Sequence, residues 1–292
     1  MSYAAGLRRE LLGLNGVRAR GMAHGRTWGS APAIVYAGDG RGHGNFYEAS
    51  YRAIVADEGW AKRLEKVHTQ GRRMRAVREH EWKELDTAVS SDALLMNVFC
   101  DPKTMRREQV QRMLGLEGEV RPVFGWKPRV PLKSGRFDAM EADMLLGELM
   151  VEAKLTESGF QSARLGLVER YVDLEEVFDL DELPRVKERV VELEDEFVVK
   201  KPMVKIAHYQ LVRGILAAHA TGKSYAVICD VRRPDLLEAW FGVVRAVQSW
   251  ELRTRVKVLT WQELAAALGG GMQAFLRDKY GIAAGVGGGV TG

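Results

Sequence analysis

The feature that most constrains the fold is a nearly continuous apolar run at residues 225–231, which reads Tyr-Ala-Val-Ile-Cys-Asp-Val. A strand that is apolar on both sides has to be buried on both faces, as in the middle of a sheet covered by helices. Residues 203–220, just before it, have apolar side chains at helical spacing. After it we expect a helix over 236–249, a strand over 255–259 and a helix over 261–280. This half of the chain is therefore predicted to be layered α/β structure.

The first half of the chain supplies a helical region and three more strands. Helical periodicity runs over residues 46–89, and Ser90-Ser91-Asp92 is a typical start for a helix that ends before Pro102. Alternating apolar residues then predict strands over 120–126, 135–143 and 148–155. The predicted fold class is thus α/β, a mixed sheet flanked by helices with an N-terminal helical region. The acidic segment 163–196 is expected to be helix or loop.

The two ends of the chain differ from its middle. Residues 1–45 are rich in glycine and arginine, and we expect a mostly irregular arm with a short helix around 7–14. A single domain is predicted over 46–280, followed by a disordered glycine-rich tail at 281–292. No apolar run reaches the roughly 20 residues of a membrane helix, and no signal peptide is evident. The two cysteines have no metal-binding spacing, so buried, reduced thiols in a cytoplasmic protein are expected.

Charge is distributed unevenly along the chain. The net charge is +9 over residues 1–136, −12 over residues 137–199 and +7 over residues 200–292. Clustered lysine and arginine suit a polyphosphate partner such as nucleic acid, although a merely solvated surface can be as uneven. The acidic segment 163–196 is open to three interpretations: a lid, a mimic of DNA, or solvated surface.

One charged pair lies in a strand whose other residues are apolar. Glu152 and Lys154 project to the same side of that strand, and burying them requires partners. If 136–143 pairs with 148–155 as a hairpin, Asp138 reaches the same place. Asp143 ranks second, because simple alternation puts it on the opposite face. Two carboxylates and a lysine suit a Mg²⁺ site that activates water near a phosphate, and an ordinary salt bridge is the plain alternative.

Other motifs accompany this pair in a fixed order. Ser90-Ser91-Asp92-Ala93 with Asn97 comes first, Glu152-Ala-Lys-Leu-Thr-Glu157 contains the pair, and Tyr209-Gln-Leu-Val-Arg213 follows. This set resembles the PD-(D/E)XK nuclease superfamily, the restriction-endonuclease-like proteins, and within it a bacterial group with an Asp…Glu-Ala-Lys-x-Thr-Glu signature. The resemblance spans roughly residues 79–260. It departs from the usual pattern at Phe137, where proline often precedes the aspartate.

The resemblance implies roles for the central residues. Asp138 and Glu152, with the backbone carbonyl of Ala153, would hold Mg²⁺ or Mn²⁺. Lys154 would serve the attacking water.

Residues outside this centre are also candidates. Many members of the superfamily add an acid from the first core helix, and here Glu81 is preferred to Glu79 and Glu84. Gln210 is assigned to the catalytic set, and Arg213 to nucleic-acid binding. Because the two lie three residues apart on one helical face, they would reach the active site or a phosphate, or form only the polar face of that helix.

Together these observations predict a Mg²⁺-dependent nuclease that hydrolyses DNA phosphodiester bonds. The basic region over 62–78, with Arg72, Arg73 and Arg75, would contact the DNA backbone, as would residues 103–112. A homodimer is plausible because many proteins of this fold are dimers, and no membrane partner is expected. Two alternatives stay open: a nucleic-acid-binding module without catalysis, and an exonuclease or RNA-directed nuclease.

Overall fold

The computed structural model describes residues 2–27, 29, 31–38, 42–66, 82–194 and 197–284, and within 189–202 only the backbone. The N-terminal part contains α1 (Tyr3–Arg18), β1 (His24–Arg26), β2 (Ile34–Tyr36), α2 (Glu48–Ala56), α3 (Glu58–Leu64) and the 3₁₀ helix η1 (Glu84–Asp86). The middle contains α4 (Ser91–Phe99), α5 (Glu108–Leu114), β3 (Val123–Trp126), β4 (Ala142–Leu146), β5 (Leu149–Ala153), β6 (Ser162–Arg164), α6 (Leu165–Val168), α7 (Leu174–Val177) and β7 (Arg185–Glu194). The C-terminal part contains β8 (Phe197–Ala207), α8 (Tyr209–Thr221), β9 (Ser224–Cys229), α9 (Pro234–Val244), α10 (Trp250–Arg255), β10 (Val256–Thr260), α11 (Trp261–Ala266) and α12 (Gly270–Tyr280).

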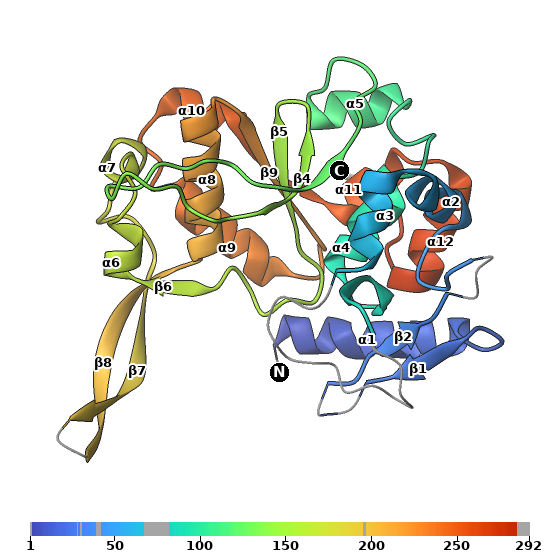
Figure 1. The fold of residues 1–292 in the computed structure, drawn as a ribbon, viewed down its shortest axis with the longest axis horizontal. Coiled ribbons are helices and arrows are strands. Elements are labelled where there is room, and N and C mark those ends of the chain that lie inside the picture. Colours follow the sequence, from blue (N-terminus) through green and yellow to red (C-terminus); the bar gives the residue numbers. More distant parts are fainter. Residues whose placement is uncertain are drawn as a thin grey trace, which may run out of the picture.

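A five-stranded sheet in the order β10-β9-β5-β4-β3 forms the centre of the fold (Figure 1). β9 pairs in parallel with β10 and β5, whereas β4 pairs antiparallel with β5 and β3. β9 covers most of the apolar run seen in the sequence, and it is buried in the interior of the sheet. The predicted mixed sheet flanked by helices is thereby confirmed.

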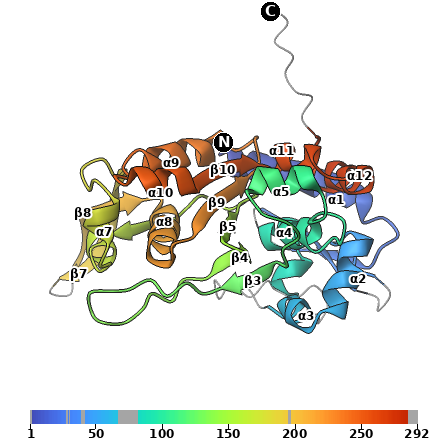
Figure 2. The ribbon, with the colours of Figure 1, turned by 90° about the horizontal axis from the view of Figure 1, so that it is seen from above.

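Helices cover both faces of this sheet, and Figure 2 shows them on either side of it. Alternate residues of a strand face opposite sides, so Met150 of β5 packs into one core and Val151 into the other. The first core is completed by α8 and α9, and the second by α1, α4, α11 and α12. Glu152 follows the alternation of Met150 and therefore points to the side of α8.

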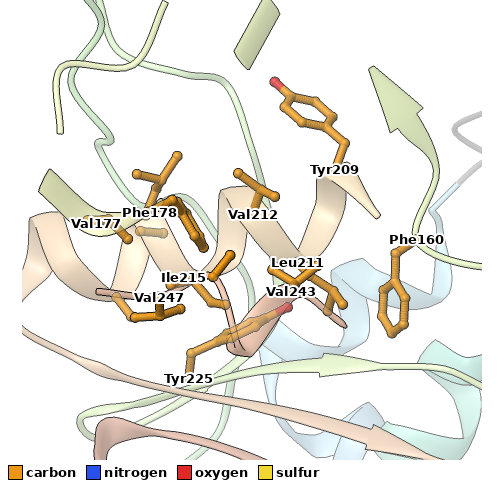
Figure 3. Packing of buried hydrophobic residues seen from close by; sticks show 14 of the residues in the cluster. Phe160, Val177, Phe178, Tyr209, Leu211, Val212, Ile215, Tyr225, Val243 and Val247 are labelled. Atoms are coloured by element: carbon orange, nitrogen blue, oxygen red, sulfur yellow. The ribbon is translucent and has the colours of Figure 1, made fainter. Parts of the chain in front are cut away.

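Helix α8 packs against β9 and closes the first core. Leu211 and Ile215 are fully buried and lie on the side of α8 that faces Tyr225 of β9 (Figure 3). The helix can lie this close because residue 214 is glycine: a Cβ there would be 2.3 Å from Cζ of the Tyr225 ring. Gly214 therefore determines how closely the helix packs on the sheet.

Replacing Gly214 with alanine is expected to destabilise the protein by about 1–3 kcal/mol, because the tyrosine ring and the helix have to move apart. Thermal denaturation would measure this loss. Gly13→Ala in the middle of α1 is the matched control, since a Cβ at that position meets no atom within 4 Å. That control should be neutral or stabilising by up to about 1 kcal/mol. Equal effects of the two substitutions would contradict the packing argument.

The N-terminal segment is more regular than the sequence indicated. In place of an irregular arm with a short helix, residues 3–18 form one helix of 16 residues, and β1 and β2 pair antiparallel. Leu7 and Leu11 of α1 are buried in the second core. Burial of a leucine contributes about 1.5–3 kcal/mol, which offsets the entropy cost of ordering a glycine-rich segment.

The acidic segment 163–196 also differs from expectation. It contains α6 and α7, but its largest element is β7, which pairs antiparallel with β8 along its whole length. This pair extends away from the body of the molecule (Figure 1). Because β8 continues to Ala207, α8 begins at Tyr209, six residues after the helix start predicted from the sequence.

Several other predictions concern parts that the structure describes incompletely. The expected helical region 46–89 contains α2, α3 and η1, but residues 67–81 lie outside the described part of the chain, as does most of the predicted tail. Cys100 and Cys229 are buried free thiols, as predicted, and burial raises the pKa of Cys229 to about 12. Over the described residues, none of the helices has both the length and the apolar character needed to cross a bilayer.

Candidate functional site

A groove of about 860 Å³ opens where β5 ends and β4 begins. Its walls come from parts of the chain that are distant in sequence: the first turns of α1, the region of η1 and α4, the loop after β5, and the start of α8. Among the described residues that line it, carboxylates outnumber cations. The charged residues of this lining are Arg8, Lys66, Glu84, Asp92, Glu141, Asp143, Glu152, Lys154, Glu157 and Arg213.

Glu152 and Lys154 lie together at the floor of the groove. Both side chains are almost fully buried, and the Lys154 ammonium donates a hydrogen bond to Glu152 Oε1 over 2.7 Å. Burial alone would lower the pKa of Lys154, but the charges of Glu152 and Glu157 outweigh it and raise that pKa above its usual value. Lys154 is therefore a cation at neutral pH.

Asp143 of β4 lies beside this pair. The register of β4 and β5 pairs Met144 with Val151, so the next positions outward, Asp143 and Glu152, oppose each other on one face. Asp143 Oδ2 accepts a hydrogen bond of 2.7 Å from the backbone N–H of Ala153. Burial and the negative charge of Glu152 raise the pKa of Asp143 well above its usual value. The charge of Lys154 lowers the pKa of Asp143 but does not outweigh these two effects.

Asp138 has a different set of partners. Its Oδ2 accepts hydrogen bonds from the Tyr171 hydroxyl at 2.6 Å and Arg213 Nε at 2.7 Å, and its Oδ1 accepts one from Arg170 at 3.0 Å. Burial by itself would raise the pKa of Asp138, but these donors outweigh it and lower the pKa. Both oxygens of Asp138 are therefore occupied by protein donors.

The course of the chain before β4 differs from the prediction. The sequence predicted a strand over 135–143, but β4 begins at Ala142, and residues 138–141 are not in a strand. The Asp138 backbone N–H instead donates to the carbonyl of Val130 over 2.9 Å. Strict alternation does not hold through an irregular segment, so the argument that put Asp143 on the opposite face from Asp138 does not apply.

One acid that borders the groove was not singled out from the sequence. Asp92, in the first turn of α4, pairs with Lys66 at 2.8 Å and with Arg63 at 3.3 Å, and its charge contributes to the raised pKa of Asp143. Glu84, a predicted candidate, also lines the groove, and burial together with Asp92 raises its pKa. The sequence signal for Asp92 was its place in Ser90-Ser91-Asp92, which was interpreted only as a helix start.

The remaining residues of the motifs hold the walls of the groove in place. Ser90 caps α4 by accepting a hydrogen bond from the backbone N–H of Ala93. The Ser91 hydroxyl donates to one oxygen of Glu157 over 2.5 Å, and the other oxygen accepts the backbone N–H of Leu155 over 2.6 Å. The Thr-Glu segment after the lysine thus ties the loop following β5 to the start of α4.

Helix α8 brings both of its predicted residues to the groove. Arg213 is held there by Asp138, whereas the buried Oε1 of Gln210 has no hydrogen-bond partner among the described residues. The other predicted site residues cannot be placed, because they lie outside the described part of the chain: Arg72, Arg73, Arg75, Glu79 and Glu81.

The residues at the groove floor fit a hard divalent cation. Asp143 and Glu152 offer carboxylate oxygens at adjacent positions, and Ala153 between Glu152 and Lys154 offers a backbone carbonyl. Oxygen ligands of this kind are those that Mg²⁺ and Mn²⁺ prefer. The direct opposition of Asp143 and Glu152 across β4 and β5 is the observation that fits a cation between them, and the raised pKa of Asp143 agrees with it.

Comparison with family models matches residues 19–281 to the family described as "Restriction Endonuclease associating with ARP". No curated protein and no solved structure matches the chain. The matched segment contains the whole central sheet and the acids of the groove floor, and the mixed sheet agrees with the restriction-endonuclease-like fold that the sequence motifs predicted. Because the match covers most of its length, the chain belongs to the family of restriction endonucleases associating with ARP.

Proposed function

We propose that this protein is a metal-dependent nuclease that hydrolyses phosphodiester bonds of DNA, with Asp143, Glu152 and Lys154 at its centre. Membership of a restriction-endonuclease family suggests nuclease activity with DNA as the substrate. The observation that carries the proposal is the convergence of two carboxylates and a buried lysine at the floor of an open groove.

Asp143 and Glu152, with the carbonyl of Ala153, would hold the metal ion. When bound, Mg²⁺ or Mn²⁺ supplies positive charge that acidifies water and stabilises the charge developing on the phosphate. Asp143 is preferred to Asp138 as a ligand because both Asp138 oxygens already accept hydrogen bonds from protein donors.

Lys154 would serve the reaction as a cation, because its ammonium is held by Glu152 at 2.7 Å and the carboxylates around it raise its pKa. Besides its bond to Glu152, the ammonium has further N–H donors, and one of them can orient the attacking water or a phosphate oxygen. Gln210 lines the groove from the first turn of α8, and its amide oxygen, which has no hydrogen-bond partner among the described residues, can accept a hydrogen bond from water.

The direct test is cleavage of supercoiled plasmid by the purified protein with Mg²⁺ or Mn²⁺, beside an EDTA control. Lys154→Met keeps the volume of the side chain and removes its charge. We expect it to slow cleavage about 10²- to 10³-fold, because a charge-stabilising donor is lost. Lys127→Met, at an exposed position just after β3, removes the same charge outside the groove and should leave the rate unchanged.

Other outcomes of this test distinguish the remaining functions. Metal-independent cleavage, or equal rates for Lys154→Met and wild type, would contradict the proposed site. Salt-sensitive DNA binding without cleavage would favour a binding module on the same fold. Linear DNA and RNA, tested beside the circular plasmid, separate an exonuclease and an RNA-directed nuclease from the proposed activity.

A further inference from the structure

The N-terminal helix α1 reaches the groove. Its first turns contribute Ala4, Ala5 and Arg8 to the lining, next to the loop that follows β5. Figure 1 shows this end of α1, marked N, below the central sheet and to the right of β6. The helix precedes residue 19, where the family match begins, so the match assigns it no role.

Helix α1 is fixed to the body of the protein at several points. Leu7 and Leu11 are buried in the second core. The Asn15 side chain donates a hydrogen bond to the backbone carbonyl of Lys279 over 2.9 Å, and Glu10 forms an ion pair with Arg232. The position of Arg8 along the groove is therefore set by the fold before any ligand binds.

Arg8 differs from the other cations of the groove. Lys66 pairs with Asp92, Lys154 with Glu152, and Arg213 with Asp138. Within the described ranges, no carboxylate pairs with Arg8, and its one hydrogen bond is a long contact of 3.4 Å from Nη2 to the Thr156 hydroxyl. A guanidinium has five N–H donors in a planar fork, so most of the hydrogen-bonding capacity of Arg8 is available to a ligand.

We propose that Arg8 binds a backbone phosphate of the DNA strand that lies in the groove; this inference rests on the proposed function. A guanidinium matches two phosphate oxygens at once, and an anionic strand needs such a cation in a groove whose described lining holds more carboxylates than cations. Its contact, Thr156, is only two residues beyond Lys154. The bound phosphate therefore lies near the one that is cleaved, and Arg8 positions the strand for the reaction.

The test compares Arg8→Ala with Arg20→Ala, which removes the same charge from an exposed position beyond the far end of α1. Binding of a short duplex is followed by fluorescence anisotropy over a range of salt, in chains that also carry Lys154→Met. The slope of the logarithm of the binding constant against the logarithm of the salt concentration measures the number of phosphate contacts. We expect Arg8→Ala to reduce this slope by about one unit and to weaken binding about equally for different DNA sequences. The cleavage rate of Arg8→Ala should be about ten- to a hundredfold lower than that of the wild type. The rate of Arg8→Lys should lie between these two.

Replacing single phosphates of the DNA with neutral methylphosphonates locates the contact. At one position along the strand, the replacement should weaken binding by the wild type but should not further weaken binding by Arg8→Ala. The absence of such a position, or equal salt slopes for Arg8→Ala and Arg20→Ala, would overturn the inference. If Arg8 controls binding but the wild type cleaves nothing, the proposed catalysis fails and the phosphate contact stands. A chain that binds no DNA overturns both.

Discussion

Asp143→Asn is expected to abolish metal-dependent cleavage, with a loss of about 10³-fold or more, equivalent to about 4 kcal/mol of transition-state stabilisation. Asparagine preserves the acceptor for the Ala153 N–H but removes the charge that would hold the ion beside Glu152. The comparison of initial rates on supercoiled plasmid, at several Mg²⁺ concentrations, measures the effect. A partial rescue by high Mn²⁺ would be consistent with a weakened metal site.

Thermal denaturation provides a second measurement that a general folding defect would not reproduce. Without metal, Asp143→Asn should be as stable as the wild type or more stable, because one of two adjacent carboxylates has been neutralised. Added Mg²⁺ or Mn²⁺ should raise the Tm of the wild type but not that of the variant. A variant that loses stability without metal, or that still gains it from metal, would contradict Asp143 as a ligand.

The sequence predicted part of this site for sound physical reasons. Glu152 lies in β5, and Lys154 follows directly after its end, where its backbone N–H still bonds to Ile228 of β9. The alternation of an extended chain therefore places both side chains on the same side. The aspartate was harder to choose, because its position depends on where β4 begins. Val130 and Asp138 form a backbone hydrogen bond across an irregular segment, and such tertiary pairing leaves no periodic pattern in the sequence.

The parts of the fold that the sequence predicted follow local patterns, whereas the parts that it did not predict depend on contacts between distant segments. Strands β9 and β10 and helices α9 and α12 follow local apolar patterns. Helix α1 and the β7–β8 pair depend on distant partners: Asn15 contacts Lys279, and Arg185 pairs with Ile206. Three glycines interrupt the apolar pattern of α1, and charged residues interrupt that of β7 and β8. Long-range packing therefore decides the structure of both segments.

Asp138→Asn is expected to destabilise the protein by about 2–4 kcal/mol, because an amide replaces a buried carboxylate that accepts hydrogen bonds from Tyr171, Arg170 and Arg213. Chemical denaturation measures this loss. Asp181→Asn is the control: its carboxylate also faces an arginine, Arg185, but is exposed, so the change should stay within about 0.5 kcal/mol.

The destabilisation by Asp138→Asn should also depend on pH in a defined direction. The arginines and Tyr171 lower the pKa of Asp138 in the folded protein, so its stabilising contribution is complete above the unfolded pKa of about 4 and is lost as the pH falls through the folded value. The difference between wild type and variant should therefore be constant from about pH 5 upward and shrink in more acidic solution. Metal-dependent cleavage should survive in whatever fraction of Asp138→Asn remains folded. If that folded fraction neither cleaves DNA nor gains Tm from Mg²⁺, Asp138 and not Asp143 holds the metal.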